Sequence, residues 1–364
     1  MVATPSHERP AVVIGSGFGG LAAAVRLRAR GYPVVLLEAL PDPGGRARVF
    51  ERDGYSFDAG PTVITAPYLI DELFSLVGRD RRDYVEFMPV DPFYRIEWLE
   101  EPGLRFDNVG SEERLIEQIR AFEPRDVDGY RRLAAHAKRI FDIGYTQLAD
   151  RPFLKIWDMI RVIPAMMRLE NYRTVYGLVS KYIRHDKLRQ VFSFQPLLVG
   201  GNPFRTTSIY MLIHWLEREW GVWFPKGGTS GLVRALVRLL GDIGVDVRMN
   251  SPVARIEVEG GRAQAVVLES GERIPCALVC SNADPLTTYG RMIEAKHRPR
   301  HSNGRLRRTR TSMGLFVGYF GTTRCYPDVA HHTILLGPRY RGLIGDIFDR
   351  KVLADDMSLY LHRP

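Results

Sequence analysis

The spacing of apolar positions changes along the chain and predicts a different kind of structure in each part. Residues 12–14 and 34–37 form short, unbroken apolar runs, which are typical of buried parallel strands. Between them, residues 21–30 place Ala and Leu on one face and Arg on the other, which predicts an amphipathic helix. From residue 94 the apolar positions alternate as in a hairpin, and residues 111–220 have a mostly helical pattern.

The mixture of strands and helices then returns. Residues 232–243 predict a helix, 253–258 and 263–268 predict a hairpin, and 277–280 predict a buried strand. Residues 314–320 alternate again, as a strand would, where the chain rejoins the second domain.

This order of elements predicts an α/β fold. A Rossmann-like dinucleotide-binding domain carries an inserted domain that is largely helical and includes a β-sheet. We assign residues 1–90 and 225–290 to the first domain and residues 91–224 and 311–364 to the second. Residues 291–310 carry eight basic side chains against one acid, and we predict that they form a mobile basic segment.

The first strand leads into a glycine motif. Gly15, Gly17 and Gly20 have the G-x-G-x-x-G spacing, which allows a tight turn, a close approach to a pyrophosphate and close packing of the helix on the strand. Glu38 ends the second strand, 18 residues after Gly20, where a carboxylate can hold a ribose 2′-hydroxyl. The same carboxylate would repel a 2′-phosphate. A dinucleotide site is therefore predicted at this turn.

Further motifs narrow the choice of dinucleotide. Gly44-Gly45-Arg46 occurs at this place in flavoproteins of the amine-oxidase and phytoene-desaturase type, and residues 54–64 closely resemble the N-terminal signature of bacterial-type phytoene desaturases. Residues 197–203, 217–225 and 337–340 resemble phytoene desaturase sequence in particular. The resemblance covers nearly the whole chain. It implies FAD as the cofactor and desaturation of phytoene, a long C40 polyene, toward lycopene in carotenoid biosynthesis.

The resemblance also gives the two domains their roles, FAD binding for the first and substrate and membrane association for the second. Members of the family carry a Gly-rich C-terminal segment near the isoalloxazine, and we expect this chain, which stops at Pro364, to lack it. The residues expected to bind FAD are Gly15, Gly17, Phe18, Gly20, Glu38, Gly45, Arg46, Gly60, Pro61, Thr62, Val253, Asn282 and Asp284.

Asp158 and Arg161 are the candidate catalytic residues. They lie three positions apart in the apolar helical pattern 156–169, so they share one helix face. Burial in such a helix would favour an acid/base role for the carboxyl group, and both residues resemble polar positions of the family. The alternative is a plain intrahelical ion pair. The helix itself fits either the core or a membrane interface.

Charge is concentrated rather than spread. The formal net charge is +9, and residues 291–310 alone contribute +7. A solvated loop and contact with anionic lipid both fit this segment, whereas nucleic acid does not, because no aromatic residues interleave with the basic ones. No apolar run approaches the ~20 residues of a membrane span. Because phytoene must come from a bilayer, we expect a cytoplasmic protein, peripheral on the inner face of the cell membrane.

Histidine and cysteine give no metal or disulfide motif. The pair His331-His332 has no third ligand at useful spacing, so we expect it to be structural or exposed, and no metal is predicted. Cys276, Cys280 and Cys325 are an odd number without a C-x-x-C spacing and are expected to be structural thiols.

Two other functions fit the same resemblance. One is a related FAD-dependent carotenoid oxidase or isomerase, and the other is a non-catalytic carrier of polyenes or prenyl lipids with this fold. The complete set of cofactor motifs favours the enzyme. Its expected partners are phytoene and partly desaturated carotenoids, an anionic membrane surface, and quinone or oxygen as the electron acceptor.

Overall fold

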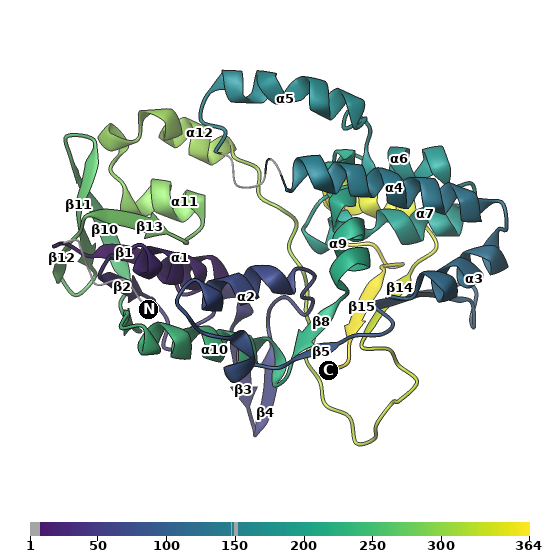
Figure 1. The fold of residues 1–364 in the computed structure, drawn as a ribbon, viewed down its shortest axis with the longest axis horizontal. Coiled ribbons are helices and arrows are strands. Elements are labelled where there is room, and N and C mark those ends of the chain that lie inside the picture. Colours follow the sequence, from purple (N-terminus) through teal and green to yellow (C-terminus); the bar gives the residue numbers. More distant parts are fainter. Residues whose placement is uncertain (1–7, 147, 149–151) are drawn as a thin grey trace. The chain divides into compact units, whose positions relative to one another are not determined.

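The computed structural model describes residues 8–146, 148 and 152–364 (Figure 1). Residues 1–7, 147 and 149–151, which belong to the two predicted domains, lie outside the described residues. The chain forms two compact units. Unit 1 contains the chain up to Met88 together with Trp223–Thr311, and unit 2 contains Pro89–Val222 and Ser312–Pro364. None of the described helices is long and apolar enough to cross a bilayer.

Unit 1 is built on a parallel sheet with the strand order β13-β1-β2-β9, so the prediction of a Rossmann-like α/β fold is confirmed. The strands are β1 (Ala11–Ile14), β2 (Val34–Leu37), β9 (Asp246–Arg248) and β13 (Leu278–Ser281). The main helices of this unit are α1 (Phe18–Ala29), α2 (Pro67–Ser75) and α10 (Gly228–Asp242).

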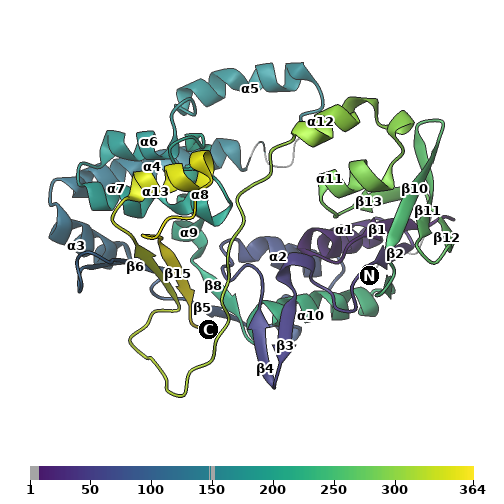
Figure 2. The same cartoon turned by 180° about the vertical axis from the view of Figure 1, so that it is seen from behind.

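The two faces of this sheet are both covered, because alternate residues of each strand point to opposite sides. Val13 and Leu36 pack on one face with the apolar residues of α1 and α10. Val12 and Leu37 pack on the other face against a second, three-stranded sheet. Its strands are β10 (Val253–Glu259), β11 (Arg262–Leu268) and β12 (Arg273–Pro275), and β10 and β11 form the predicted hairpin (Figure 2). Burial on both faces explains why the central strands β1 and β2 are unbroken apolar runs.

Smaller elements complete unit 1. A hairpin joins β3 (Val49–Arg52) to β4 (Tyr55–Asp58), and β5 (Phe87–Pro89) pairs with β8 (Trp223–Pro225). After β13 come α11 (Pro285–Thr287), the short helical segments η4 (Thr288–Met292), η5 (Ala295–His297) and η6 (Pro299–His301), and α12 (Asn303–Arg308).

The basic residues 291–310 are grouped with unit 1, and their predicted mobility stays a prediction. Within this segment, the side chain of Arg298 is buried. Its guanidinium donates to the carbonyl oxygens of Ile293 and His301 and to Oδ1 of Asn303. The side chain of Arg298 thus connects three turns of this segment by hydrogen bonds instead of being exposed to solvent.

Unit 2 contains a four-stranded sheet with the order β15-β14-β6-β7. Its strands are β6 (Tyr94–Trp98), β7 (Arg105–Asn108), β14 (His332–Leu336) and β15 (Leu359–His362). The predicted hairpin β6–β7 is confirmed, and β14 joins β6 in parallel and β15 in antiparallel pairing. The helices of unit 2 are α3 (Glu112–Phe122), α4 (Asp126–Gly144), α5 (Ile156–Arg168), α6 (Val175–Tyr182), α7 (Asp186–Ser193), α8 (Gln195–Leu198), α9 (Leu212–Trp220) and α13 (Tyr340–Gly345). Its short helical segments are η3 (Ser208–Met211) and η7 (Asp346–Arg350). Unit 1 contains two further short segments, η1 (Gly45–Ala47) and η2 (Arg81–Asp83).

The strand expected at residues 314–320 does not form. This stretch has no regular backbone structure, and its apolar side chains are exposed, with Phe316 fully accessible. Alternation predicts a strand only where a neighbouring strand supplies hydrogen bonds, and among the described strands none pairs with this stretch.

Candidate functional site

The turn between β1 and α1 brings the first three glycines together. Gly15 has a φ of +92°, a conformation that residues with a side chain rarely adopt. A Cβ atom at Gly20 would lie 1.9 Å from the carbonyl oxygen of Gly15, so only glycine allows α1 to pack this close to β1. Gly17 is the N-cap residue of α1, and no side chain of the described residues caps this helix. Its first N–H groups can therefore bind a phosphate.

Glu38 lies beside this turn, at the carboxyl end of β2, and is only 6% exposed. One carboxylate oxygen accepts hydrogen bonds from the backbone N–H and the hydroxyl of Ser16, at 2.8 and 2.6 Å, and the other accepts from the N–H of Leu40 at 3.0 Å. A carboxylate has roughly four acceptor positions, so Glu38 can still accept a bond from a ribose hydroxyl.

Ser16 is a site residue that the motif search missed. Its hydroxyl donates to Glu38 and accepts from the N–H of Gly44, at 3.2 Å. It therefore connects the first glycine motif both to the carboxylate and to the second glycine motif. The only sequence signal for this role is its place between Gly15 and Gly17.

The second glycine motif lies against the first. Gly17 and Gly44 form a parallel bridge, and Gly44 and Gly45 have φ values of +112° and +57°. A Cβ atom at Gly45 would lie 3.2 Å from Cα of Gly17, and one at Gly60 would lie 2.4 Å from the carbonyl oxygen of Arg46. The structure thus brings the separate motifs to one place and leaves Arg46 exposed beside them.

The loop that follows Gly60 is held by an acid that the search also missed. Asp58 accepts hydrogen bonds from the N–H groups of Thr229 and Ser230, at 2.8 and 3.1 Å, at the start of α10. The hydroxyl of Thr229 donates to the carbonyl oxygen of Pro61 at 2.5 Å. The negative charge suits a helix N-terminus. Pro61 and the neighbouring Thr62 are thereby fixed relative to the parallel sheet.

The remaining predicted cofactor residues are Asn282, Asp284, Phe18 and Val253, and not all of them lie at the glycine turn. Asn282 follows β13 and lies over the glycine turn, where a Cβ atom at Gly17 would be 2.8 Å from its Nδ2 atom. Asp284 accepts from the N–H of Leu286 and so caps α11. Phe18 and Val253 are half-buried and pack against the two sides of the core. Asn282 and Phe18, the first residue of α1, lie at the turn itself.

These residues fit the ADP half of a dinucleotide. The glycines lie so close to Asn282 and to one another that a Cβ atom would not fit, open N–H groups lie at the start of α1, and a buried carboxylate lies at the end of the next strand. This is the arrangement that holds a pyrophosphate and an unphosphorylated ribose.

Asp158 and Arg161 lie on α5, and this helix has no buried residue. The interpretation of residues 156–169 as a core helix is therefore wrong. Asp158 Oδ2 accepts from the N–H of Lys155 at 2.9 Å, which closes the helix start. Among the ion pairs of the described residues, none joins Asp158 to Arg161. The burial on which we based their acid/base role is not found, and the role itself stays a prediction.

Unit 2 also contains a buried polar group that the sequence did not reveal. Glu217 on α9 is fully buried, accepts from the hydroxyl of Tyr94 at 2.9 Å and lies next to the side-chain amide of Gln195. Burial raises the pKa of Glu217 to about 7, against the opposing effects of Tyr94 and Arg218. Burial also lowers the pKa of His214, on the same helix, to about 3.

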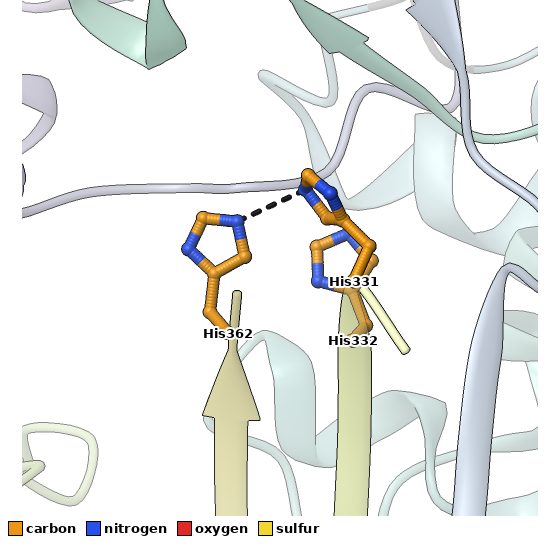
Figure 3. A group of neighbouring side chains, drawn as sticks. All are labelled: His331, His332 and His362. Carbon is orange, nitrogen blue, oxygen red and sulfur yellow. Dashed lines mark hydrogen bonds between the residues drawn. The ribbon is translucent and has the colours of Figure 1, made fainter. Parts of the chain in front are cut away.

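Three histidines come together at the end of the β14–β15 pair (Figure 3). His332 lies directly opposite His362, and His331 precedes β14. The sequence spacing offers no third ligand for the pair His331-His332, and the structure brings His362 to it from another strand. His362 comes from a strand 30 residues further along the chain, and only the antiparallel pairing of the strands brings it close.

Comparisons with known proteins agree with this geometry. Residues 18–303 match the family of flavin containing amine oxidoreductases. The chain is 49% identical over 98% of its length to the lycopene-forming phytoene desaturase of Pantoea ananas and covers 72% of that protein. It is 47% identical over 98% of its length to the lycopene-forming enzyme of a Paracoccus strain, of which it covers 71%.

Solved structures show the same fold at low sequence identity. A Pyrococcus furiosus protein superposes with a TM-score of 0.60 at 17% identity, over 97% of this chain and 78% of that one. The wild-type putrescine oxidase structure gives a TM-score of 0.52 at 17% identity, over 78% of this chain and 60% of the oxidase.

Proposed function

Because this chain belongs to the flavin-containing amine oxidoreductases, and within them to the bacterial phytoene desaturases, we propose that it desaturates phytoene toward lycopene with FAD as its cofactor. The observation that carries the proposal is the 49% identity to a lycopene-forming desaturase over 98% of the chain. The glycine turn and Glu38 support it, because they fit the ADP half of FAD. The substrates are phytoene and its partly desaturated products.

Desaturation removes two hydrogens from neighbouring carbons of the polyene. FAD, when bound, supplies the acceptor for the hydride, and the second hydrogen leaves as a proton. The residues of unit 1 would bind and orient the cofactor: the start of α1 would hold the pyrophosphate, and Glu38 would accept a hydrogen bond from the ribose. Ser16 keeps the Glu38 carboxylate in place by two hydrogen bonds. Glu38 also disfavours a nicotinamide cofactor that carries a 2′-phosphate.

Asp158, with Arg161 on the same face of α5, is the proposed acid/base pair. Asp158→Asn keeps a side-chain oxygen that can accept from the Lys155 N–H, but it removes the charge. We expect this variant to lose turnover while it keeps bound FAD and its helix content. Conversion of phytoene at the wild-type rate would overturn the assignment, and Asp158→Ala measures the separate effect of losing the cap.

Phytoene is insoluble in water, so we propose that the enzyme works at an anionic membrane surface on the cytoplasmic side. The exposed apolar side chains of α5 and the basic side chains of α12 support this. Quinone or oxygen reoxidises the cofactor. An anaerobic assay with and without added quinone distinguishes the two acceptors.

The function is tested with the 364-residue chain, FAD and phytoene dissolved in anionic liposomes. We expect conjugated products that absorb at longer wavelength, separated by chromatography, and anaerobic bleaching of the flavin absorbance when phytoene is added. If the chain binds FAD but oxidises or isomerises another polyene, it is a related carotenoid oxidase or isomerase instead of a phytoene desaturase. A colourless protein that extracts polyene from the liposomes would identify a carrier instead.

A further inference from the structure

The three histidines at the end of β14 and β15 have the geometry of a metal site. One ring nitrogen of each residue lies within 4.8 Å of those of the other two. The Nε2 atoms of His331 and His362 share a hydrogen bond of 3.0 Å, which a bound metal would replace. In a tetrahedral site with metal–nitrogen bonds of about 2.0–2.1 Å, two ligand nitrogens lie roughly 3.3 Å apart. Small side-chain rotations are therefore enough to place one cation between the rings.

His332 supplies a second, independent observation. Its side chain is fully buried, and its Nε2 atom has no hydrogen-bond partner among the described residues. The other ring nitrogen, Nδ1, lies 2.7 Å from the hydroxyl of Tyr360. When Nδ1 carries the proton and donates it to Tyr360, Nε2 presents a lone pair. This is how an outer hydrogen bond normally orients a metal-bound imidazole.

The backbone holds these rings in place. His332 and His362 are a direct cross-strand pair, and the N–H of Arg363 donates to the carbonyl oxygen of His331 at 2.9 Å. The guanidinium of Arg363 donates to the carbonyl oxygen of Val329 at 2.7 Å. The donor atoms thus come from two hydrogen-bonded strands rather than from a loop, which is a precise way to position ligands.

We propose that His331, His332 and His362 bind one divalent transition-metal ion of the Zn²⁺ class and that the metal fastens β15 to β14. Three imidazoles without a carboxylate suit Zn²⁺, Cu²⁺ or Ni²⁺ and not Mg²⁺ or Ca²⁺, which require oxygen ligands. Three protein ligands leave a fourth tetrahedral position open to water. The three histidines come together only when β14 and β15 are paired. The binding free energy of the metal therefore adds to the stability of this sheet.

The test uses the 364-residue chain stripped with a chelator and titrated with Zn²⁺ against a competing chromophoric chelator. We expect one equivalent to bind and the melting temperature to rise. The double variant His331→Gln, His362→Gln should lose this site, with an affinity at least about 100-fold lower. Tyr360→Phe should weaken binding roughly 10-fold, the effect of losing an outer hydrogen bond.

The matched control is the double variant His301→Gln, Cys325→Ser, which removes a histidine and an exposed thiol that lie outside the three-histidine cluster. It should bind one equivalent as the wild type does. Circular dichroism of the metal-free proteins shows whether each variant folds, and visible absorption of Co²⁺ bound to the wild type reports tetrahedral coordination without any substitution. The proposal is overturned by one-equivalent binding that survives His331→Gln, His362→Gln, by binding lost in the control, or by no saturable binding to the wild type.

Discussion

At the scale of single residues, the dinucleotide site requires glycines, because a side chain at these positions would collide with neighbouring atoms. Gly20 is the sharpest case, because the carbonyl oxygen of Gly15 occupies the place of its Cβ atom. Ser16 and Glu38 depend instead on polar atoms that hydrogen-bond to each other and to the neighbouring backbone. These two kinds of requirement respond differently to substitution, the first through steric displacement and the second through unpaired buried groups.

Gly20→Ala should abolish FAD binding, because the 1.9 Å approach can be relieved only by moving α1 away from β1. Flavin retained after gel filtration measures the effect. Gly241→Ala is the matched control, since a Cβ atom at this helical glycine of α10 meets nothing within 4 Å. The control should keep FAD and gain about 0.5–1 kcal/mol of stability. Equal flavin content in both variants would contradict the steric argument.

The buried carboxyl group of Glu217 makes stability depend on pH. Its pKa is about 7 in the folded chain, above the ordinary value of 4.5, so the folded state holds the proton more tightly. This contribution to stability is complete below pH 4.5 and is lost as the pH rises toward 7. Glu217→Gln cannot titrate at this position. We expect its stability relative to the wild type to improve by roughly 3 kcal/mol between pH 4.5 and pH 8.

Urea unfolding of both proteins at several pH values measures this difference. Glu219→Gln, on the same helix but not buried, is the control and should show no such trend. A difference between the wild type and Glu217→Gln that is constant across the pH range would show that Glu217 does not hold its proton in the folded chain.

At the scale of elements, α5 differs from the other long helices of unit 2. Helices α3, α4, α6, α7 and α9 each bury apolar residues, whereas α5 buries none and exposes Ile156 and Trp157 by more than 60%. An amphipathic helix normally places its apolar side against a partner. A bilayer surface is the partner that the proposed substrate requires.

Replacing Ile160 and Ile163 by serine should weaken sedimentation with liposomes by about tenfold or more, because each buried CH₂ group contributes about 0.8 kcal/mol. Val352→Ser, Leu353→Ser is the matched control, since it removes two exposed aliphatic side chains of the same unit outside α5. Loss of binding in the control but not in the α5 variant would move the membrane contact to another surface.

At the scale of the whole molecule, the net charge of +9 predicts a salt-dependent attraction to anionic membranes. Binding to liposomes with anionic lipid should fall as salt rises from 0.05 to 0.5 M, about the range over which the screening length drops severalfold. Binding to neutral liposomes should be weaker and insensitive to salt. Sedimentation at each salt concentration measures both, and equal affinity for the two lipid mixtures would exclude an electrostatic contribution.

The sequence predicts a feature of this structure well when the residues that form it lie close together along the chain. Gly15, Gly17, Gly20 and Glu38 lie within one strand–helix–strand segment, so their spacing alone predicts the turn. Residues whose role depends on distant pairing were missed. Asp58 acts through the start of α10, 171 residues away.

Two contacts that the sequence did not reveal have the same physical origin. His362 joins the other histidines only through the antiparallel register of β14 and β15, which no spacing rule encodes. Arg298 looked like one charge in a solvated run, yet backbone carbonyl oxygens satisfy it. In both cases the chemistry of the side chain was visible, but its partners were not.

The strand order of unit 1 has a consequence for biosynthesis. β1 is made near the start of the chain, whereas its neighbour β13 follows roughly 260 residues later. At about 5–20 residues per second, the ribosome needs roughly 15 to 50 s to close this gap. Throughout that time one edge of the apolar strand β1 has no permanent neighbour. Substitutions in β13 should therefore reduce the yield of soluble protein in cells more than they reduce the stability of the protein that has already folded.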